Sequence, residues 1–237
     1  MNNDLPYVGQ ELDIFAHARN WKRYWSSSVR PFLRGDVLEV GAGIGVNTPF
    51  LDPQKARSWT CLEPDAGLAQ RATVALASDP MTRNCHVLTG TTESLAQERQ
   101  FDAVLYIDVL EHIDRDKEEL ARAANLLRQG GTLIVLSPAH QWLYTAFDQS
   151  IGHVRRYNRT SLLSCGPPTC SLKRLWYLDS IGTLASCANR LFLRQAMPGL
   201  QQILFWDNYL VPASTIADYL FFHRLGKSIL AVWTRNH

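Results

Sequence analysis

From residue 37 onward, short apolar runs alternate with amphipathic stretches along the chain. Five of these runs are rich in β-branched residues, as buried strands are. They cover residues 37–40, 59–62, 86–88, 103–107 and 133–136. Helical patterns lie between them, most clearly at 67–77 and 117–127, and Gly130 with Gly131 is expected to end the second helix. This alternation predicts an α/β fold, with an open parallel sheet covered by helices on both faces.

Two regions fall outside this alternation. Residues 11–34 precede the first strand, and their aromatic side chains recur at helical spacing. We expect a helix there that either packs on the sheet or forms a lid over a bound ligand. Residues 178–226 are rich in Leu, Phe, Trp and Tyr, and strand-like segments at 172–177 and 228–233 flank them. They therefore predict a helical insertion before the last strand.

The composition excludes several classes of protein. Hydrophobic residues make up 46% of the chain and charged residues 19%, which indicates a packed core. The net charge of +2 gives no reason to expect nucleic acid as a partner. Five scattered cysteines without a C-x-x-C pair indicate reduced thiols. Since we find neither a secretory signal pattern nor an apolar stretch of membrane-spanning length, we expect a cytoplasmic protein without a transmembrane segment.

The strongest local motif is V-L-E-V-G-A-G-I-G at residues 37–45, in which the first predicted strand runs directly into a glycine turn. Glycines at Gly41, Gly43 and Gly45 let the backbone approach a ligand closely, because no Cβ atom stands in the way. Glu63 ends the second predicted strand, where a carboxylate can accept both hydroxyl groups of a ribose. Together they predict a ligand that contains adenosine.

The details of the turn distinguish between two such ligands. A dinucleotide site needs G-x-G-x-x-G, but here Val46 occupies the position of the third glycine. Glu39, two residues before the first glycine, would repel a pyrophosphate. It would suit the ammonium group of a nucleoside that carries an amino acid. A nicotinamide-dependent oxidoreductase stays as the alternative.

The pattern E-x-G-x-G-x-G with the strand-end Glu63 resembles class I S-adenosylmethionine-dependent methyltransferases. Residues 101–140, with the L-E-H turn and the G-G-strand-P pattern, resemble the ubiquinone-biosynthesis-like branch of that family. The resemblance implies a Rossmann-like sheet of seven strands with the last one antiparallel. We divide the chain into four parts. These are a lid at 1–36, a cofactor-binding core at 37–177, the insertion at 178–226 and the last strand at 227–237.

The resemblance also assigns the residues that hold S-adenosylmethionine. Those expected at its methionine part are Glu39, Gly41, Ala42, Gly43 and Gly45. Glu63 is expected at the ribose. The residues expected at the adenine are Thr91, Thr92 and Glu93, and those at the sulfonium are Ile107, Asp108 and His112. The family often has Asp where Thr91 stands, so the contact to the adenine amino group is expected to differ here.

The methyl acceptor must bind elsewhere, and the segment 138–158 is the best candidate. It follows the fifth predicted strand at its carboxyl end, where ligands bind in such sheets. It is similar to a G-H-x-R-R-Y segment of some bacterial methyltransferases. The expected acceptor-binding residues are Tyr144, Asp148, His153, Arg155, Arg156 and Tyr157, and the candidate catalytic bases are His112, His140 and His153. The alternative is an ordinary solvated loop.

A metal site at the L-E-H turn is a further interpretation. Asp108, Glu111 and His112 resemble the metal ligands of some methyltransferases, and such side chains bind Mg²⁺ or Mn²⁺. The same turn is frequent in relatives without a metal, where Glu111 supports the following helix. We therefore expect no metal.

These observations predict an enzyme of class EC 2.1.1, in biosynthesis, that methylates a small molecule or a peptide. Oxygen is the expected methyl-accepting atom, as a carboxylate or a hydroxyl, because the arginines and histidines of 138–158 suit both. A non-catalytic cofactor-binding partner of another enzyme is a second alternative. The aromatic insertion is expected to form a wall for a bulky acceptor, a homodimer surface or a patch on a membrane, and simple core packing is the remaining alternative.

Overall fold

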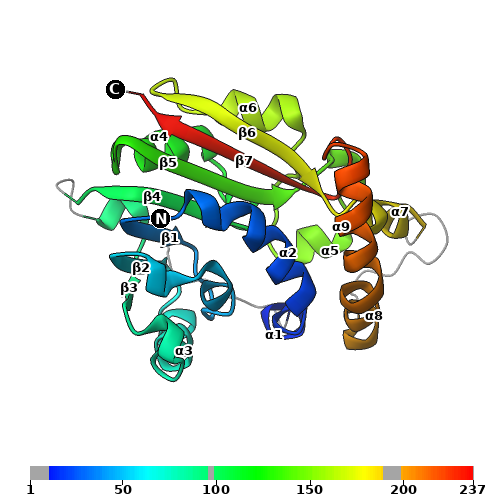
Figure 1. The fold of residues 1–237 in the computed structure, drawn as a ribbon, viewed down its shortest axis with the longest axis horizontal. Helices are drawn as coiled ribbons and strands as arrows, with labels where there is room; N and C mark the ends of the chain where they lie inside the picture. Colours follow the sequence, from blue (N-terminus) through cyan, green and yellow to red (C-terminus); the bar gives the residue numbers. More distant parts are fainter. Residues whose placement is uncertain (1–10, 96–98, 189–198, 237) are drawn as a thin grey trace.

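A computed structural model describes residues 11–95, 99–188 and 199–236. In this part of the chain, seven strands form one sheet in the order β3-β2-β1-β4-β5-β7-β6 (Figure 1). The strands are β1 (Asp36–Val40), β2 (Ser58–Glu63), β3 (Cys85–Thr89), β4 (Phe101–Ile107), β5 (Leu127–Pro138), β6 (Cys170–Leu178) and β7 (Ser228–Arg235). Strands β1 to β5 pair in parallel, whereas β7 runs antiparallel to both β5 and β6. The predicted fold class is confirmed.

Helices and short turns connect these strands. The α-helices are α1 (Glu11–Ala16), α2 (Arg19–Val29), α3 (Ala66–Ala77), α4 (Asp116–Asn125), α5 (Ala146–Ser150), α6 (Arg159–Cys165), α7 (Ser180–Ala188), α8 (Leu200–Phe205) and α9 (Val211–Leu220). A π-helical segment, η9 (Trp206–Leu210), joins α8 to α9. The 3-10 turns are η1 (Arg30–Phe32), η2 (Thr48–Leu51), η3 (Pro53–Lys55), η4 (Pro80–Thr82), η5 (Thr92–Ser94), η6 (Leu110–His112) and η7 (Gln141–Leu143).

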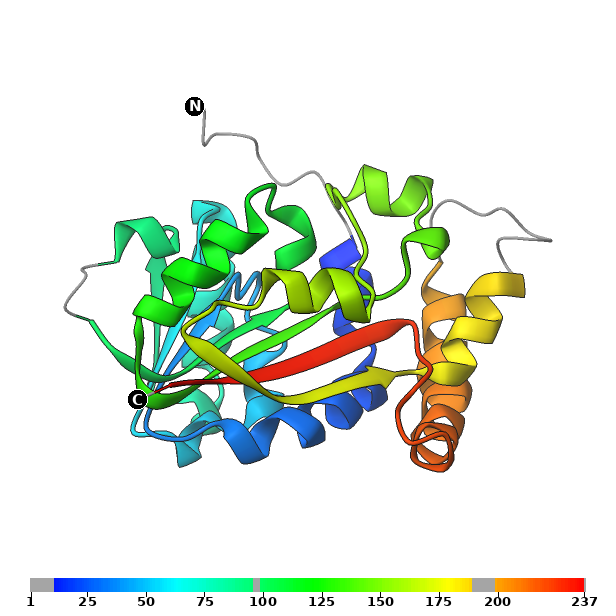
Figure 2. The same ribbon diagram turned by 90° about the horizontal axis from the view of Figure 1, so that it is seen from above.

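The sheet lies between two helical layers (Figure 2). Successive residues of a strand point to opposite faces, so each face packs against its own layer of helices. On one side, Trp25 of α2 packs with strand residues such as Leu105 and Val232. On the other side, Leu120 of α4 and Leu162 of α6 pack with the alternate strand residues. The central strands β1 and β4 are therefore buried on both faces and are mainly apolar, whereas the edge strands β3 and β6 are more exposed.

Two boundaries differ from the sequence prediction. The helix expected over 11–34 is interrupted between α1 and α2, and Ala18 precedes the second helix with a non-helical backbone. Gly130 and Gly131 do not end a helix, since α4 stops at Asn125 and both glycines lie within β5. The β5 strand begins early because Leu127 already pairs with Phe101 of β4. Pairing with a neighbouring strand thus overrides a sequence signal that usually ends a helix.

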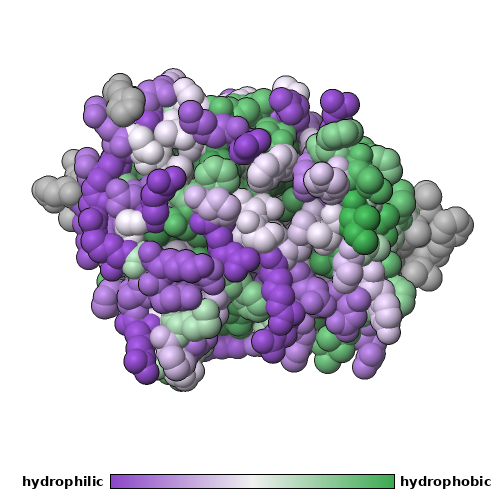
Figure 3. Space-filling model, viewed as in Figure 1, coloured by the Kyte–Doolittle hydropathy of each residue, from purple (hydrophilic) through white to green (hydrophobic). Residues whose placement is uncertain are grey.

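The helices between β6 and β7 stand at the end of the sheet where the parallel strands finish (Figure 1). Their outward face is apolar (Figure 3), and its most exposed large side chains are Tyr209, Ile216, Tyr219, Leu220 and Phe222. The acidic residues of η9 and α9, Asp207 and Asp218, are buried and do not interrupt this face. Among the described residues, no helix has the length and apolar character needed to cross a bilayer.

Candidate functional site

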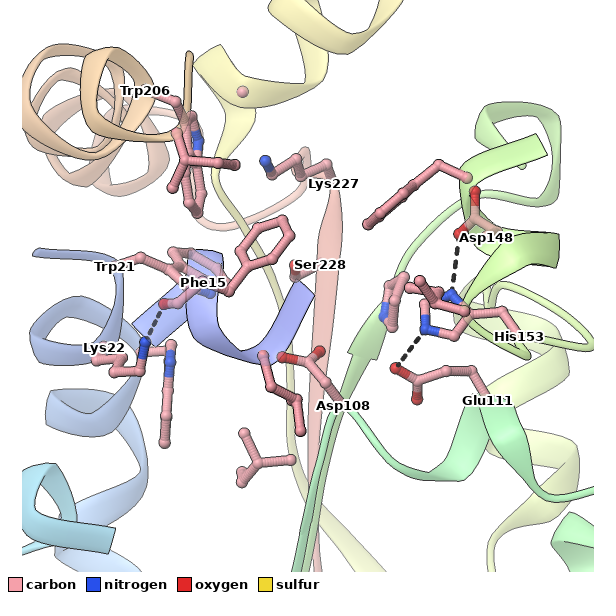
Figure 4. Close-up of a pocket in the computed structure, with 18 of the residues that line it drawn as sticks. Phe15, Trp21, Lys22, Asp108, Glu111, Asp148, His153, Trp206, Lys227 and Ser228 are labelled. Carbon is pink, nitrogen blue, oxygen red and sulfur yellow. Dashed lines mark hydrogen bonds and ion pairs between the residues drawn. The ribbon is translucent and has the colours of Figure 1, made fainter. Parts of the chain in front are cut away.

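A cavity of about 720 Å³ lies at the carboxyl ends of β1 and β4 (Figure 4). Its floor consists of the glycine turn after β1 and the residues that follow β4. Helices α1 and α2 form one wall, the helices between β6 and β7 form a second, and the segment around α5 forms a third. The predicted site residues that line it are Gly41, Ala42, Gly43, Ile107, Asp108, His112, Asp148, His153 and Arg156.

The glycine turn has a backbone that other residues adopt only with strain. Gly41 and Gly43 have φ angles of 69° and 57°. A Cβ atom on Gly41 would lie 2.5 Å from Val109 Cγ2, so a side chain would displace the residue after Asp108. The N–H of Gly43 donates to Glu63 Oε2 at 2.8 Å, which joins the ends of β1 and β2. The turn therefore places two residues without side chains at the cavity floor.

Glu39 is buried at the end of β1. Its carboxylate lies beneath the turn, where it accepts hydrogen bonds from Trp59 Nε1 and Thr48 Oγ1, both at 2.9 Å. Burial raises its pKa, and these two hydrogen bonds oppose that shift. Glu39 does not line the cavity, so its contribution is to fix the strand end and the turn from below.

The remaining cofactor candidates lie outside the cavity wall. Glu63 is buried beside the turn, with Oε1 accepting the N–H of Asp65 at 3.0 Å. Thr92 is also buried and donates to Glu119, while the carboxylate of Glu93 is exposed and pairs with Arg122. Thr91 caps the η5 turn, and Gly45 packs against Ala72 of α3. Residues 91–93 thus border the β2–β3 edge without reaching the cavity.

Asp108 stands at the centre of the floor. It has a left-handed backbone, with φ of 54°, at the end of β4. Its side chain faces the cavity and is accessible to solvent. The protein that surrounds the cavity limits hydration of the carboxylate, and this desolvation raises the pKa of Asp108 to about 6, against the attraction of His153 and Lys22. The site therefore contains a carboxyl group that titrates near neutral pH.

Three polar side chains meet at the opposite corner of the floor. Glu111 is fully buried, and its Oε2 accepts from Ser137 at 3.0 Å. The rings of His112 and His153 lie edge to face, with centroids 4.6 Å apart. Burial, together with the neighbouring His153, lowers the pKa of His112 to about 4, so it is neutral at pH 7. Burial raises the pKa of Glu111 as well.

Asp148 organises the segment after β5. It accepts from Arg156 Nε at 2.7 Å and from the N–H of Thr145 at 2.8 Å, and it lies 3.0 Å from His153 Nδ1. Burial would raise the pKa of Asp148, but the hydrogen bonds from His153 and Arg156 hold it well below its usual range. Asp148 therefore fixes the side chains of His153 and Arg156 at the cavity wall.

The other candidates of this segment point away from the cavity. Arg155 pairs with Asp116, and the buried Tyr157 donates to the same carboxylate at 2.8 Å. His140, with φ of 66°, stacks on Tyr177 at a centroid distance of 5.1 Å. Tyr144 donates from its hydroxyl group to the carbonyl of His153 at 2.6 Å. These residues support the loop, whereas His153 and Arg156 reach the ligand space.

Several cavity residues were not found from the sequence. Lys22 of α2 is buried and donates to the carbonyl of Phe15. Lys227 precedes β7, and its ammonium group lies 3.8 Å from the ring centroid of Trp206 and 3.3 Å from Asp179 Oδ2. The antiparallel course of β7 was a usable signal, since it places the start of β7 at the carboxyl ends of the parallel strands. The aromatic wall includes Phe15, Trp21, Trp25, Phe147, Phe205 and Trp206.

Comparisons with known proteins agree with this architecture. The sequence matches the family model of a methyltransferase domain over residues 15–197. No curated protein matches the chain at a significant level. An S-adenosylmethionine-dependent methyltransferase from Clostridium acetobutylicum has a similar structure, with a TM-score of 0.57 at 11% identity, over 99% of this chain and 94% of that chain.

Two further solved structures are similar. The N-methyltransferase NodS from Bradyrhizobium japonicum has a TM-score of 0.57 at 14% identity, over 94% of this chain and 97% of that chain. The YcgJ protein from Bacillus subtilis has a TM-score of 0.59 at 16% identity, over 93% and 100% of the two chains. At these identities the likeness establishes the fold alone, and the family model, which covers most of the chain, carries the assignment. The chain belongs to the family of methyltransferase domains, and its cofactor is S-adenosylmethionine.

Proposed function

We propose that this methyltransferase transfers a methyl group to an oxygen atom, a hydroxyl or a carboxylate, of a small molecule. One observation carries the proposal: the glycine turn, the corner with His112 and His153, and the aromatic wall all line one cavity. The cofactor supplies an activated methyl group on a sulfonium. The chain's own residues then have to align the acceptor with it and exclude water. A cavity enclosed by three walls suits a small molecule better than a peptide.

We assign the cofactor to the part of the cavity above Gly41, Ala42 and Gly43. Two glycines without Cβ atoms, at the carboxyl end of β1, allow the close approach that a bound nucleoside requires. Ile107 and Asp108 border the same space. We therefore favour methyl transfer over the alternative of a nicotinamide-dependent oxidoreductase. The L-E-H turn and the segment 152–157 support a place in the ubiquinone-biosynthesis-like branch.

We assign the acceptor to the aromatic part of the cavity. Trp21 and Trp206 provide an apolar surface, with ring centroids 5.7 Å apart and ring planes inclined by 51°. The acceptor oxygen would then approach His153, whose ring Asp148 holds in place. A hydroxyl needs a group that takes up its proton, and a neutral histidine has that capacity near pH 7. A carboxylate needs none, and Arg156 at the same wall could bind it.

Two experiments test the proposal in sequence. Calorimetric titration with S-adenosylhomocysteine, the demethylated cofactor, should give one site with micromolar or tighter affinity. Release of S-adenosylhomocysteine should then be measured with matched aromatic acceptors that carry a hydroxyl, a carboxylate, an amine or a thiol. We expect turnover with the hydroxyl or the carboxylate. Turnover with the amine or the thiol alone would contradict the assignment to oxygen.

A further inference from the structure

Glu111, His112 and His153 come together although they belong to two separate segments. Glu111 and His112 end the η6 turn after β4, whereas His153 follows α5. One ligand atom from each residue lies within 4.8 Å of the other two. Figure 4 shows Glu111 and His153 facing each other at the cavity wall. The sequence pattern had pointed to Asp108 with Glu111 and His112, so the structure defines a different set of three.

The second observation is an unsatisfied oxygen in this cluster. Oε2 of Glu111 accepts from Ser137, but Oε1 accepts no hydrogen bond from any described residue. The side chain has no exposed surface. A buried carboxylate oxygen without a partner is costly, because it has lost the water that would otherwise bind it. The imidazole nitrogen His153 Nε2 lies 3.7 Å from Glu111 Oε1.

The hydrogen bonds around His153 explain which of its nitrogens is free. An ionised Asp148 only accepts hydrogen bonds, so Nδ1 of His153 carries the hydrogen in their 3.0 Å contact. In the neutral ring, Nε2 then presents a lone pair toward Glu111. Carboxylates orient metal-binding histidines in this way. Arg156 and Thr145 in turn hold Asp148, so the orientation is built into the loop.

The distances fit a single ion. Bonds from a divalent ion to nitrogen or oxygen are about 2.0 to 2.2 Å, so two atoms bound to one ion lie up to about 4.2 Å apart. The 3.7 Å between Glu111 Oε1 and His153 Nε2 already falls within this limit. The widest separation in the cluster, under 4.8 Å, requires only a small rotation of one side chain.

We propose that Glu111, His112 and His153 bind one divalent first-row transition-metal ion. Two imidazoles with one carboxylate suit ions such as Zn²⁺, Mn²⁺ or Fe²⁺ better than Mg²⁺ or Ca²⁺. Three protein ligands leave coordination positions open, and here they face the cavity. The open positions would hold the acceptor oxygen, a role that rests on the proposed function. With the ion bound, His153 is a ligand and no longer a base.

Metal binding can be measured directly, without knowledge of the acceptor. Protein freed of metal by a chelator should be titrated with Zn²⁺ and Mn²⁺ by calorimetry, and with Co²⁺ by visible absorption. We expect one ion per chain. The variants Glu111→Gln and His153→Asn should each weaken binding by about 100-fold or more. The control is His86→Asn, an exposed histidine on β3, which should bind the ion as the unchanged protein does.

The outcomes separate this inference from the proposed function. If the unchanged protein binds no ion, or if both variants bind it equally well, the inference is overturned and His153 only bridges two carboxylates. Affinity for S-adenosylhomocysteine, measured on the metal-free protein and the variants, reports whether they are folded. Binding of S-adenosylhomocysteine without metal binding overturns the metal site alone. Metal binding without S-adenosylhomocysteine binding supports the metal site and contradicts the proposed function.

Discussion

Asp207, between β6 and β7, accepts the backbone N–H of Trp21 at 2.8 Å, across 186 residues of sequence. Its second oxygen accepts the N–H of Asn20 at 3.0 Å. Both N–H groups belong to the first turn of α2, where the helix itself provides no acceptor. The insertion thus caps the N-terminal helix, and the two segments close the cavity together.

Replacing this cap should loosen both segments. Asp207→Ala removes the acceptor for one buried and one partly buried N–H group, so we expect the free energy of unfolding to fall by about 2 kcal/mol. Chemical denaturation measures this change, and calorimetry should show weaker binding of S-adenosylhomocysteine. Asn208→Ala is the matched control, since the neighbouring Asn208 accepts an exposed hydrogen bond from the side chain of Asn20 and does not cap the backbone of α2. An equal loss in the two variants would show that the cap contributes nothing of its own.

The glycine turn can be tested with a pair of glycines. Gly43→Val places a side chain where the backbone meets the cofactor, so S-adenosylhomocysteine binding should be lost. Gly130→Val is the control because Gly130 also has a positive φ, of 74°, but no atom lies within 4 Å of its added Cβ. Both variants carry the strain of a left-handed backbone, about 1 to 3 kcal/mol. Unchanged affinity in Gly43→Val would refute the cofactor position.

Replacing Arg156 should lower turnover and have little effect on the affinity for the cofactor. Arg156→Ala removes a partner of Asp148 and frees the ring of His153, so we expect kcat to fall by about 10- to 100-fold. Affinity for S-adenosylhomocysteine should stay within about twofold, because the glycine turn is untouched. Arg159→Ala, at an exposed position that starts α6, is the control. If Arg156→Ala keeps full activity, the acceptor binds elsewhere in the cavity.

Lys22 should make stability depend on pH. Burial lowers its pKa from 10.5 to about 8 in the folded protein, so the unfolded chain binds more protons between these two values. The free energy of unfolding therefore rises with pH between about 8 and 10.5. The buried charge of Lys22 destabilises the folded protein most below pH 8. Lys22→Met should stabilise the protein by up to about 3 kcal/mol at pH 7, and by much less at pH 10.

Chemical denaturation of Lys22→Met at both pH values measures this difference. Lys55→Met, at an exposed lysine, should show no comparable change with pH. The same stabilisation at pH 7 and pH 10 would mean that packing, and not charge, explains the effect.

Local patterns account for the parts of the structure that the sequence predicted. The strands could be located because a sheet buried on both faces needs continuous apolar runs, and the glycine turn because a positive φ favours glycine. Contacts between distant segments leave no such pattern. Nothing near Asp207 indicates that it caps α2, and nothing near His153 indicates Glu111 as its neighbour. The position of Glu39 beneath the cavity floor is a further example, because it depends on the hydrogen bonds from Trp59 and Thr48.

Strand β7 lies between β5 and β6, although it follows both of them along the chain. During translation, β5 and β6 therefore leave the ribosome before the strand that joins them exists. Each then presents a row of unpaired backbone groups, which is a template for pairing with other chains. The aromatic helices that follow β6 also emerge before β7, and they add exposed apolar surface at the same stage. Newly made chains of this protein should accordingly depend on chaperones until β7 is released and completes the sheet.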